Sequence, residues 1–252
     1  MGALSVTLGT VGGIAGLAFV AWPIAIWWEV KKCEKPKYTL LRTLGQRRGW
    51  WGRVRPAADV RLYTPYLMAE VTMQGDNVDM QEALSGGFRQ IAGFIFGKNM
   101  APESGEKAKV AMTSPVTLEA PLTGGGGDSA KIAMTSPVTA EMGAGGTYKV
   151  SFIMPSQYSK ETLPKPVNPS VEIHEKPART MVALTWNGKS PREAEVAQRS
   201  SELRELMAGA GLTPKAGTSL HVWQYDPPFQ WRWFRTNEVL YEVEGEEATS
   251  TS

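Results

Sequence analysis

The chain contains one nine-residue sequence twice, as Lys109-Val-Ala-Met-Thr-Ser-Pro-Val-Thr117 and as Lys131-Ile-Ala-Met-Thr-Ser-Pro-Val-Thr139. Only Val110 and Ile132 differ between the copies, which start 22 residues apart (131 − 109) and flank the run Gly124–Gly127. A solenoid needs about three stacked units to bury a shared face, so two copies do not form one. The duplication predicts one strand-and-turn element, in which a single copy serves the fold and the other extends a loop.

The pattern of apolar residues around the duplication predicts an α+β fold. Helical periodicity predicts one helix over 79–96 and a second helix that begins at Ser190 and Pro191 and ends at Gly211. Alternating polar and apolar residues predict strands in two hairpins (60–63 with 66–73, and 171–175 with 180–186) and at 109–119, 131–141, 148–154, 219–225 and 235–243. Strands before and after each helix are typical of a mostly antiparallel sheet.

The N-terminal segment 3–28 carries no charged residue, and a helix of that length crosses a hydrocarbon core of about 30 Å. We expect a transmembrane anchor; a cleaved signal or transit peptide and a buried or hairpin helix are the alternatives. Residues 29–57 are rich in Lys and Arg and are expected to be a juxtamembrane linker. The positive-inside rule then puts the folded domain on the cytosolic or stromal side. The acidic segment 244–252 is expected to be a disordered tail.

Several segments resemble the SOUL/heme-binding-protein family, in the same order along the chain. The repeated Met-Thr-Ser-Pro-Val unit is similar to the family's hallmark, and its repetition is similar to plant and algal members. The other similar segments are Glu34–Thr39, Asp59–Tyr63 with 66–73, Gly87–Gly97, Val150–Pro155, Tyr225-Asp-Pro-Pro228 and Phe234–Val239. The resemblance implies a twisted antiparallel sheet or distorted β-barrel of about eight or nine strands flanked by two helices. This domain would span 58–243, with a Gly-rich insertion at 120–130.

The resemblance also implies non-covalent binding of heme or another tetrapyrrole. Such a ligand is a flat apolar disc with two carboxylates on one edge, so its site needs an apolar wall and cations at the rim. The outer face of the first helix and the loop after the Pro-Pro turn are similar to the segments that line the heme cleft in SOUL-type proteins. That similarity implies a wall of Phe88, Ile91, Ala92 and Ile95, with Arg89 and Lys98 as rim cations. The alternative is that the apolar stripe of this helix is ordinary core.

Histidine is the expected axial ligand of heme iron, and the chain contains only His174 and His221. Neither lies where the histidine-ligated animal members carry theirs, which favours a hydrophobic binding mode. His221 is the better candidate, and a structural histidine is the alternative. The residues expected near it in the pocket are the aromatics Trp223, Tyr225, Phe229 and Trp231. Met112 and Met134 are expected to pack rather than to bind iron.

The loop Phe229-Gln-Trp-Arg-Trp-Phe234 has three interpretations, which the sequence leaves open. It could stack on a porphyrin, enter the interface of a membrane, or close the core.

Several other functions lack their motifs in this sequence. Cys33 is the only cysteine, so an internal disulfide, a thiolate metal cage and c-type heme attachment are excluded. The glycine run has no Walker A continuation, no catalytic constellation is recognisable, and we expect no metal site. A net charge of only +2 gives no reason to expect nucleic acid as a partner.

These observations favour a non-enzymatic, membrane-anchored carrier, buffer or sensor of tetrapyrroles, in contact with membrane lipid and with the chloroplast as one candidate location. One alternative is a membrane-tethered interaction module that has lost pigment binding and holds a protein partner through the membrane helix or the Trp-Arg-Trp loop. Another is an enzyme, which would place a buried carboxylate such as Glu70 or Glu172 in the pocket.

Overall fold

A computed structural model of the chain describes residues 28, 32–48, 54–74, 79–102, 110, 116–120, 147–226 and 230–244, with only the backbone at 116–120. Within these ranges, no helix is both long and apolar enough to cross a bilayer. The predicted anchor at 3–28 lies outside the described residues except for Trp28. The two repeats, with Met112 and Met134, also lie outside the described residues, except for Val110, Val116 and Thr117. Most of the Gly-rich insertion and most of the C-terminal tail lie outside them as well.

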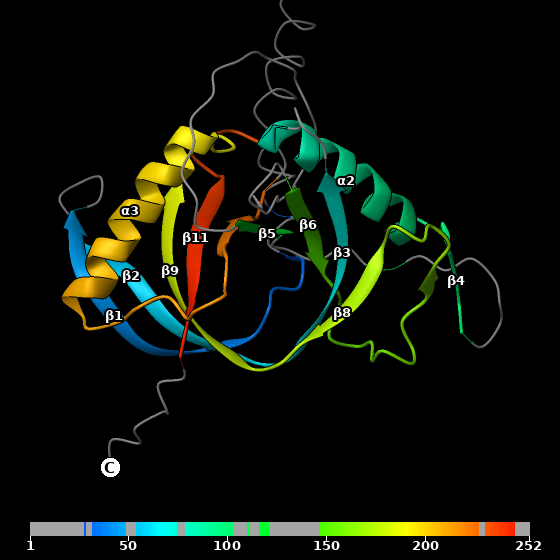
Figure 1. The fold of residues 1–252 in the computed structure, drawn as a ribbon, viewed down its shortest axis with the longest axis horizontal. Coiled ribbons are helices and arrows are strands. Elements are labelled where there is room, and N and C mark those ends of the chain that lie inside the picture. Colours follow the sequence, from blue (N-terminus) through cyan, green and yellow to red (C-terminus); the bar gives the residue numbers. More distant parts are fainter. Residues whose placement is uncertain are drawn as a thin grey trace, which may run out of the picture.

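The described chain forms one nine-stranded sheet, a separate two-stranded sheet and two helices (Figure 1). Along the large sheet the strand order is β1-β2-β9-β11-β10-β5-β6-β3-β8. The strands are β1 (Tyr38–Arg48), β2 (Val54–Tyr63), β3 (Tyr66–Gln74), β5 (Val116–Ala120), β6 (Thr147–Ile153), β8 (Glu172–Lys176), β9 (Arg179–Asn187), β10 (Leu220–Gln224) and β11 (Thr236–Val243). The small sheet pairs β4 (Asn99–Met100) with β7 (Lys165–Pro166), and the helices are α2 (Met80–Ile95) and α3 (Glu193–Gly209).

Every strand pair in both sheets is antiparallel. The predicted α+β class with an antiparallel sheet and two helices is therefore confirmed. The expected barrel is wrong, because β1 and β8 are the two ends of the sheet and the sheet does not close.

Two bent strands run side by side through both halves of the large sheet. β2 continues into β3 across Thr64-Pro65, and β8 continues into β9 across Pro177-Ala178. β2 pairs with β9, and β3 pairs with β8; the two bends lie at the base of the curved sheet in Figure 1. The two predicted hairpins are therefore wrong, since neither pair of successive strands pairs with itself. Proline has no N–H for a sheet ladder, and here it marks a bend instead of a turn.

Residues 38–48 form the edge strand β1. The sequence pattern had predicted them to be part of a basic linker at 29–57. Strand β1 pairs with β2 over its whole length, from Tyr38↔Tyr63 to Arg48↔Val54. Most of its side chains are exposed, and Leu44 is the one that is buried. An edge strand with a single buried side chain has no clear alternation of apolar and polar residues. The sequence pattern therefore gives no sign of this strand.

Both helices cover one face of the large sheet, α2 on β3 and β6 and α3 on β9 and β11. The buried side chains between these layers include Val60, Val150, Val182, Leu184 and Val222 from strands, and Ile91, Phe94 and Leu203 from helices. Asp79 caps α2 by accepting the backbone N–H of Glu82 at 2.7 Å. Gly87 lets α2 approach β6, because a Cβ there would lie 2.6 Å from Cβ of Val150.

The start of α3 differs from the prediction by two residues. Its N-cap is Arg192, whose side chain makes no capping hydrogen bond. Ser190 is not the cap because its hydroxyl accepts a hydrogen bond from Nη1 of Arg235 at 3.2 Å. The predicted end is confirmed, since Gly211 follows the C-cap residue Ala210 with a φ of +72°, a conformation that favours glycine.

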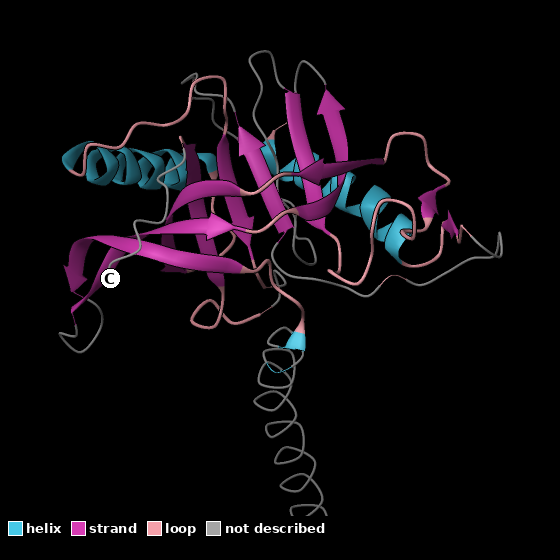
Figure 2. Cartoon of the chain, turned by 90° about the horizontal axis from the view of Figure 1, so that it is seen from below, coloured by secondary structure: helices cyan, strands magenta, loops and turns pink. Residues whose placement is uncertain are grey.

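The opposite face of the large sheet is buried although no described helix covers it. Tyr63, Met181 and Trp223 are fully buried there, together with Ile153, Ala183 and Leu240. The ring centroids of Tyr63 and Trp223, from β2 and β10, are 5.2 Å apart in an edge-to-face contact. The sheet therefore curls so that its two halves bury this side, which we call the interior face. Figure 2 shows the strands in front of both helices.

Candidate functional site

The predicted tetrapyrrole wall does not form one surface. Ile91 and Ile95 are 0% and 1% exposed and belong to the core between α2 and the sheet. Phe88 is half-buried, and its ring centroid lies 5.7 Å from that of Phe152. Ala92 is half-buried like Phe88, and it is the one residue of the four that does not pack against the core. The apolar stripe is thus mostly core, because a helix that covers a sheet must bury its apolar side.

The two predicted rim cations lie along one line of the outer side of α2. Arg89 is exposed, and its Nε donates to the carbonyl of Ser85 at 3.2 Å. Lys98 follows the turn at Gly97, whose φ is +115°, and its backbone N–H donates to the carbonyl of Gly93 at 2.8 Å. Its side-chain stem crosses Gly93, where a Cβ would meet Cδ of Lys98 at 3.3 Å.

Arg89 and Gly93 are four residues apart and therefore lie one turn from each other on the same helix face. The outer side of α2 thus offers two cations beside Ala92 and the exposed Phe96. We call these four residues the outer α2 surface. Sequence reasoning missed Phe96, although it continues the spacing of Phe88 and Ala92 by one further turn.

The remaining predicted site residues lie on the other side of the sheet. His221 and Trp223 are 2% and 0% exposed, and both point from β10 toward the interior face, with Tyr225 packed against the same cluster. Helix α2 covers the opposite face, so His221 and the outer α2 surface cannot belong to one site. Phe229 lies outside the described residues.

The interior face holds a polar network centred on Glu238 of β11. Its Oε1 accepts from Nη1 of Arg61 at 2.9 Å and from the hydroxyl of Thr185 at 2.8 Å. Its Oε2 accepts from the hydroxyl of Tyr225 at 2.6 Å. Arg61 also pairs with Asp59 at 2.8 Å. The partners of Glu238 therefore come from β2, β9 and the end of β10.

Burial and charge shift the pKa values in this network. Burial opposes the charged form of Arg61, but Glu238, Tyr63 and Asp59 together outweigh it and raise the pKa of the guanidinium. Burial, and next the charge of Glu238, raise the pKa of the Tyr63 phenol and of the Tyr225 phenol well above the usual range. The network therefore combines a charged arginine and neutral tyrosines with the side chains of Glu238 and Asp59.

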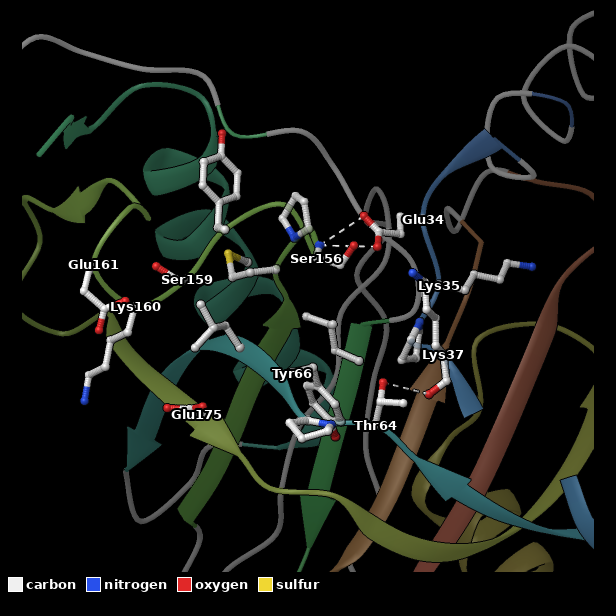
Figure 3. A pocket seen from close by; sticks show the side chains of 17 residues that line it. Glu34, Lys35, Lys37, Thr64, Tyr66, Ser156, Ser159, Lys160, Glu161 and Glu175 are labelled. Carbon is white, nitrogen blue, oxygen red and sulfur yellow. Dashed lines mark hydrogen bonds between the residues drawn. The ribbon is translucent and has the colours of Figure 1, made fainter. Parts of the chain in front are cut away.

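A cavity of about 350 Å³ opens beside the bend at Thr64-Pro65 (Figure 3). Tyr66, Leu67, Ile153 and Met154 are part of its lining, together with the segments 34–37 and 155–161. Both carboxylate oxygens of Glu34 accept the N–H of Ser156, at 3.2 and 3.3 Å, and so join these two segments. The volume is at the low end for small-molecule sites, about 300–1,000 Å³. None of the predicted site residues lines the cavity.

The aromatic loop is partly core and partly exposed. Gln230 is buried, and the ring of Trp231 stacks on that of Phe234 with 6.3 Å between centroids. Trp233 is 65% exposed, and the guanidinium of Arg232 lies 4.9 Å from its ring. Core closure therefore accounts for one side of the loop and leaves Trp233 in solvent.

The carboxylates that an enzyme was expected to use do not face the cavity. Glu70 is buried and accepts from the hydroxyl of Ser151 at 3.3 Å, with Nζ of Lys149 3.6 Å away. Glu172 is exposed and lies 3.1 Å from Nε2 of His174. Among the described residues no group of three or more His, Cys, Asp or Glu side chains is placed to hold a metal ion.

These features define an α+β domain with a curled antiparallel sheet and one cationic, partly apolar helix surface. The sequence profile described as "SOUL heme-binding protein" matches residues 33–242. The chain therefore belongs to the SOUL heme-binding family. No curated protein has a significantly similar sequence.

Three solved structures show a partial structural similarity to the chain, each with a TM-score below 0.5. The C-terminal domain of EcmrR shares 11% identity with a TM-score of 0.49, over 75% of this chain and 98% of that one. A hydrolase from Listeria innocua shares 11% with a TM-score of 0.47, over 74% and 91% of the two chains. A hydrolase encoded by lin2189 of Listeria innocua shares 10% identity with a TM-score of 0.45, over 74% of this chain and 91% of that one.

Proposed function

We propose that the chain binds heme or a related tetrapyrrole reversibly, without covalent attachment, and acts as a carrier, buffer or sensor rather than a catalyst. The observation that carries this proposal is the family match over residues 33–242. A fold alone does not fix a function, so the proposal also needs a surface with suitable chemistry.

The outer α2 surface has the chemistry that a tetrapyrrole requires. Ala92, Phe96 and the accessible edge of Phe88 would contact the apolar disc. Arg89 and Lys98 would bind the two carboxylates, because charge-assisted hydrogen bonds to carboxylates are among the strongest in proteins. Glu82 in the first turn is the one acidic residue of α2, and the rest of the helix, 83–95, contains no Asp or Glu.

Iron has no protein ligand in this proposal. Helix α2 contains no His, Cys or Tyr, and His221 lies on the interior face. Metal-free protoporphyrin should therefore bind about as tightly as hemin.

The test is a titration of the full chain, in detergent micelles, with hemin and with protoporphyrin, followed through the Soret band. Arg89→Gln with Lys98→Gln should weaken both ligands by more than tenfold, since charged hydrogen bonds contribute about 1.5–3 kcal/mol each. Arg204→Gln with Lys189→Gln is the matched control, because both residues are exposed and far along the chain from α2. Equal affinities in the two double variants would refute the site, and no Soret response in the wild type would refute the function.

We further propose a single membrane span at 3–28, with the folded domain on the cytosolic or stromal side and a chloroplast membrane as one candidate. The uncharged stretch and the basic residues after it support this proposal. A protease-protection assay on sealed membranes tests it: cleavage of the domain only after the membrane is opened would contradict it.

The exposed Trp233 supports a second candidate function, a membrane-tethered module that binds a protein partner through the Trp-Arg-Trp loop. An exposed aromatic beside an arginine is typical of interface hot spots. A partner that is lost on Trp233→Ala, with tetrapyrrole affinity unchanged, would favour this candidate over the carrier.

A further inference from the structure

We infer that the outer face of the small β4–β7 sheet docks on an anionic lipid surface. The ribbon contributes Lys98, Met100, Lys165 and Val167 to this face, and Phe96, the C-cap residue of α2, precedes Lys98 by two residues. We call these five residues the ribbon face. The ribbon face shares Phe96 and Lys98 with the outer α2 surface, so the experiment tests it at Lys165 and Val167, which are not part of that surface.

Strand pairing puts these side chains on one side of the ribbon. Met100 lies opposite Lys165, and the N–H of Val167 donates to the carbonyl of Lys98 at 3.2 Å. Side chains alternate along a strand, so these four positions share one face. Asn99 points to the other side, where it is 1% exposed and its Nδ2 donates to the carbonyl of Phe94 at 2.6 Å.

The ribbon face is unusually apolar for an exposed surface. Phe96, Met100 and Val167 are 59%, 53% and 60% exposed. They are three of the eight large hydrophobic side chains that are exposed in the described part of the chain. Apolar residues gathered at one place on a surface mark an interaction site, whereas single ones do not.

The charged side chains of the ribbon face are both cationic. Residues 83–102 and 162–171 contain Arg89, Lys98 and Lys165 and no Asp or Glu. None of these three cations takes part in an ion pair with a described residue. The ribbon face itself is therefore complementary to an anionic partner.

A lipid surface fits this composition better than a protein does. Lysine is depleted in protein–protein interfaces. At a membrane, lysine stems lie along apolar surface while their ammonium groups reach the lipid phosphates. Hydrogen bonds hold the ribbon in place, because Nδ2 of Asn168 donates to Oε1 of Gln90 on α2 at 3.0 Å. The face is therefore formed before it meets the membrane.

The experiment uses the full chain in vesicles of phosphatidylcholine, with or without phosphatidylglycerol. Cys33 is the only cysteine, so Cys33→Ser with Val167→Cys gives one site for an environment-sensitive fluorophore. We expect a blue shift, and quenching by doxyl-labelled lipid, only with phosphatidylglycerol. Val54→Cys in the same background is the control, because Val54 is 57% exposed and pairs with Arg48 of the edge strand β1. Figure 1 shows β1 and β4 on opposite sides of the domain.

Lys165→Gln should lower the ratio of docked to undocked ribbon about fivefold, since one lysine near an anionic surface contributes about 1 kcal/mol. Its Soret titration should be unchanged, which separates this inference from the tetrapyrrole proposal. Equal quenching at positions 54 and 167 would overturn the inference. Quenching at 167 that does not depend on phosphatidylglycerol, or no quenching at all, would overturn it as well.

Discussion

Arg61 and Glu238 form an ion pair of 2.9 Å inside the curled sheet, although they are 177 residues apart in the sequence. Both side chains are almost fully buried, at 6% and 5% exposure. A buried pair of this kind depends on hydrogen bonds to its remaining atoms, and Thr185, Tyr225 and Asp59 supply them. The pair joins β2 to β11 across β9, so it ties the early and late parts of the chain together.

Removing one member of this pair should destabilise the domain strongly. Glu238→Gln leaves a buried guanidinium with a weaker partner, and we expect a loss of about 3 kcal/mol in the free energy of unfolding measured by urea titration. The matched control is Glu202→Gln, which removes a part-exposed pair with Arg199 and should cost about 0.5 kcal/mol or less. Equal losses in the two variants would contradict a structural role for the interior network.

The buried tyrosines should make the domain sensitive to alkali. Burial raises the pKa of Tyr63 and of Tyr225 in the folded state, whereas the unfolded chain releases these protons near pH 10. A raised pKa of an acid means that stability is complete below about pH 10 and falls as the pH rises above it. Each such tyrosine contributes a slope of about 1.4 kcal/mol per pH unit.

Tyr225→Phe should therefore be less stable at neutral pH but lose stability less steeply between about pH 10 and 11.5. Urea titrations at several pH values measure the slope, and absorbance at the phenolate band reports ionisation. Parallel pH profiles of the variant and the wild type would show that Tyr225 ionises freely in the folded state.

Gly87 should be irreplaceable where α2 crosses β6. A Cβ at this position would lie 2.6 Å from both Cβ and Cγ2 of Val150, so Gly87→Ala must shift the helix and should cost about 1–3 kcal/mol. Gly209→Ala is the control, because a Cβ at this helical position meets no atom within 4 Å. It should stabilise the domain by up to about 1 kcal/mol. Thermal melts of both variants should move in opposite directions.

The two helices should respond differently to loss of their N-cap side chains. Asp79→Ala removes an acceptor at 2.7 Å from the N–H of Glu82 and should cost about 1 kcal/mol. Arg192→Ala removes a side chain that makes no capping bond and should leave the melting temperature within error. A similar loss of stability in both variants would mean that the hydrogen bond from Glu82 to Asp79 does not stabilise α2.

The sequence predicted what depends on local pattern. The period of α2, its apolar stripe with Ile91 and Ile95, and the stop at Gly211 after α3 are all features that neighbouring residues determine. The family resemblance added the antiparallel sheet with two helices.

What the sequence missed depends on contacts between distant segments. The partner of Arg61 lies on β11, and Ser190 binds Arg235 instead of capping α3. The bends at Pro65 and Pro177 have the same signature as hairpin turns, and only the long-range pairing of β2 with β9 distinguishes them. The predicted wall included Ile91 and Ile95, which belong to the core, because an apolar helix stripe can equally cover a sheet or a ligand.

The most direct test of the account is a hemin and protoporphyrin titration of Ala92→Glu beside Ala208→Glu, both in the full chain. Ala92 lies between the proposed cations on α2, and a carboxylate there would repel the carboxylates of the ligand, whereas Ala208 is exposed on α3. We predict that Ala92→Glu weakens both ligands by at least about tenfold and that Ala208→Glu binds like the wild type. Wild-type affinity in Ala92→Glu would contradict the proposal that the outer α2 surface binds the tetrapyrrole.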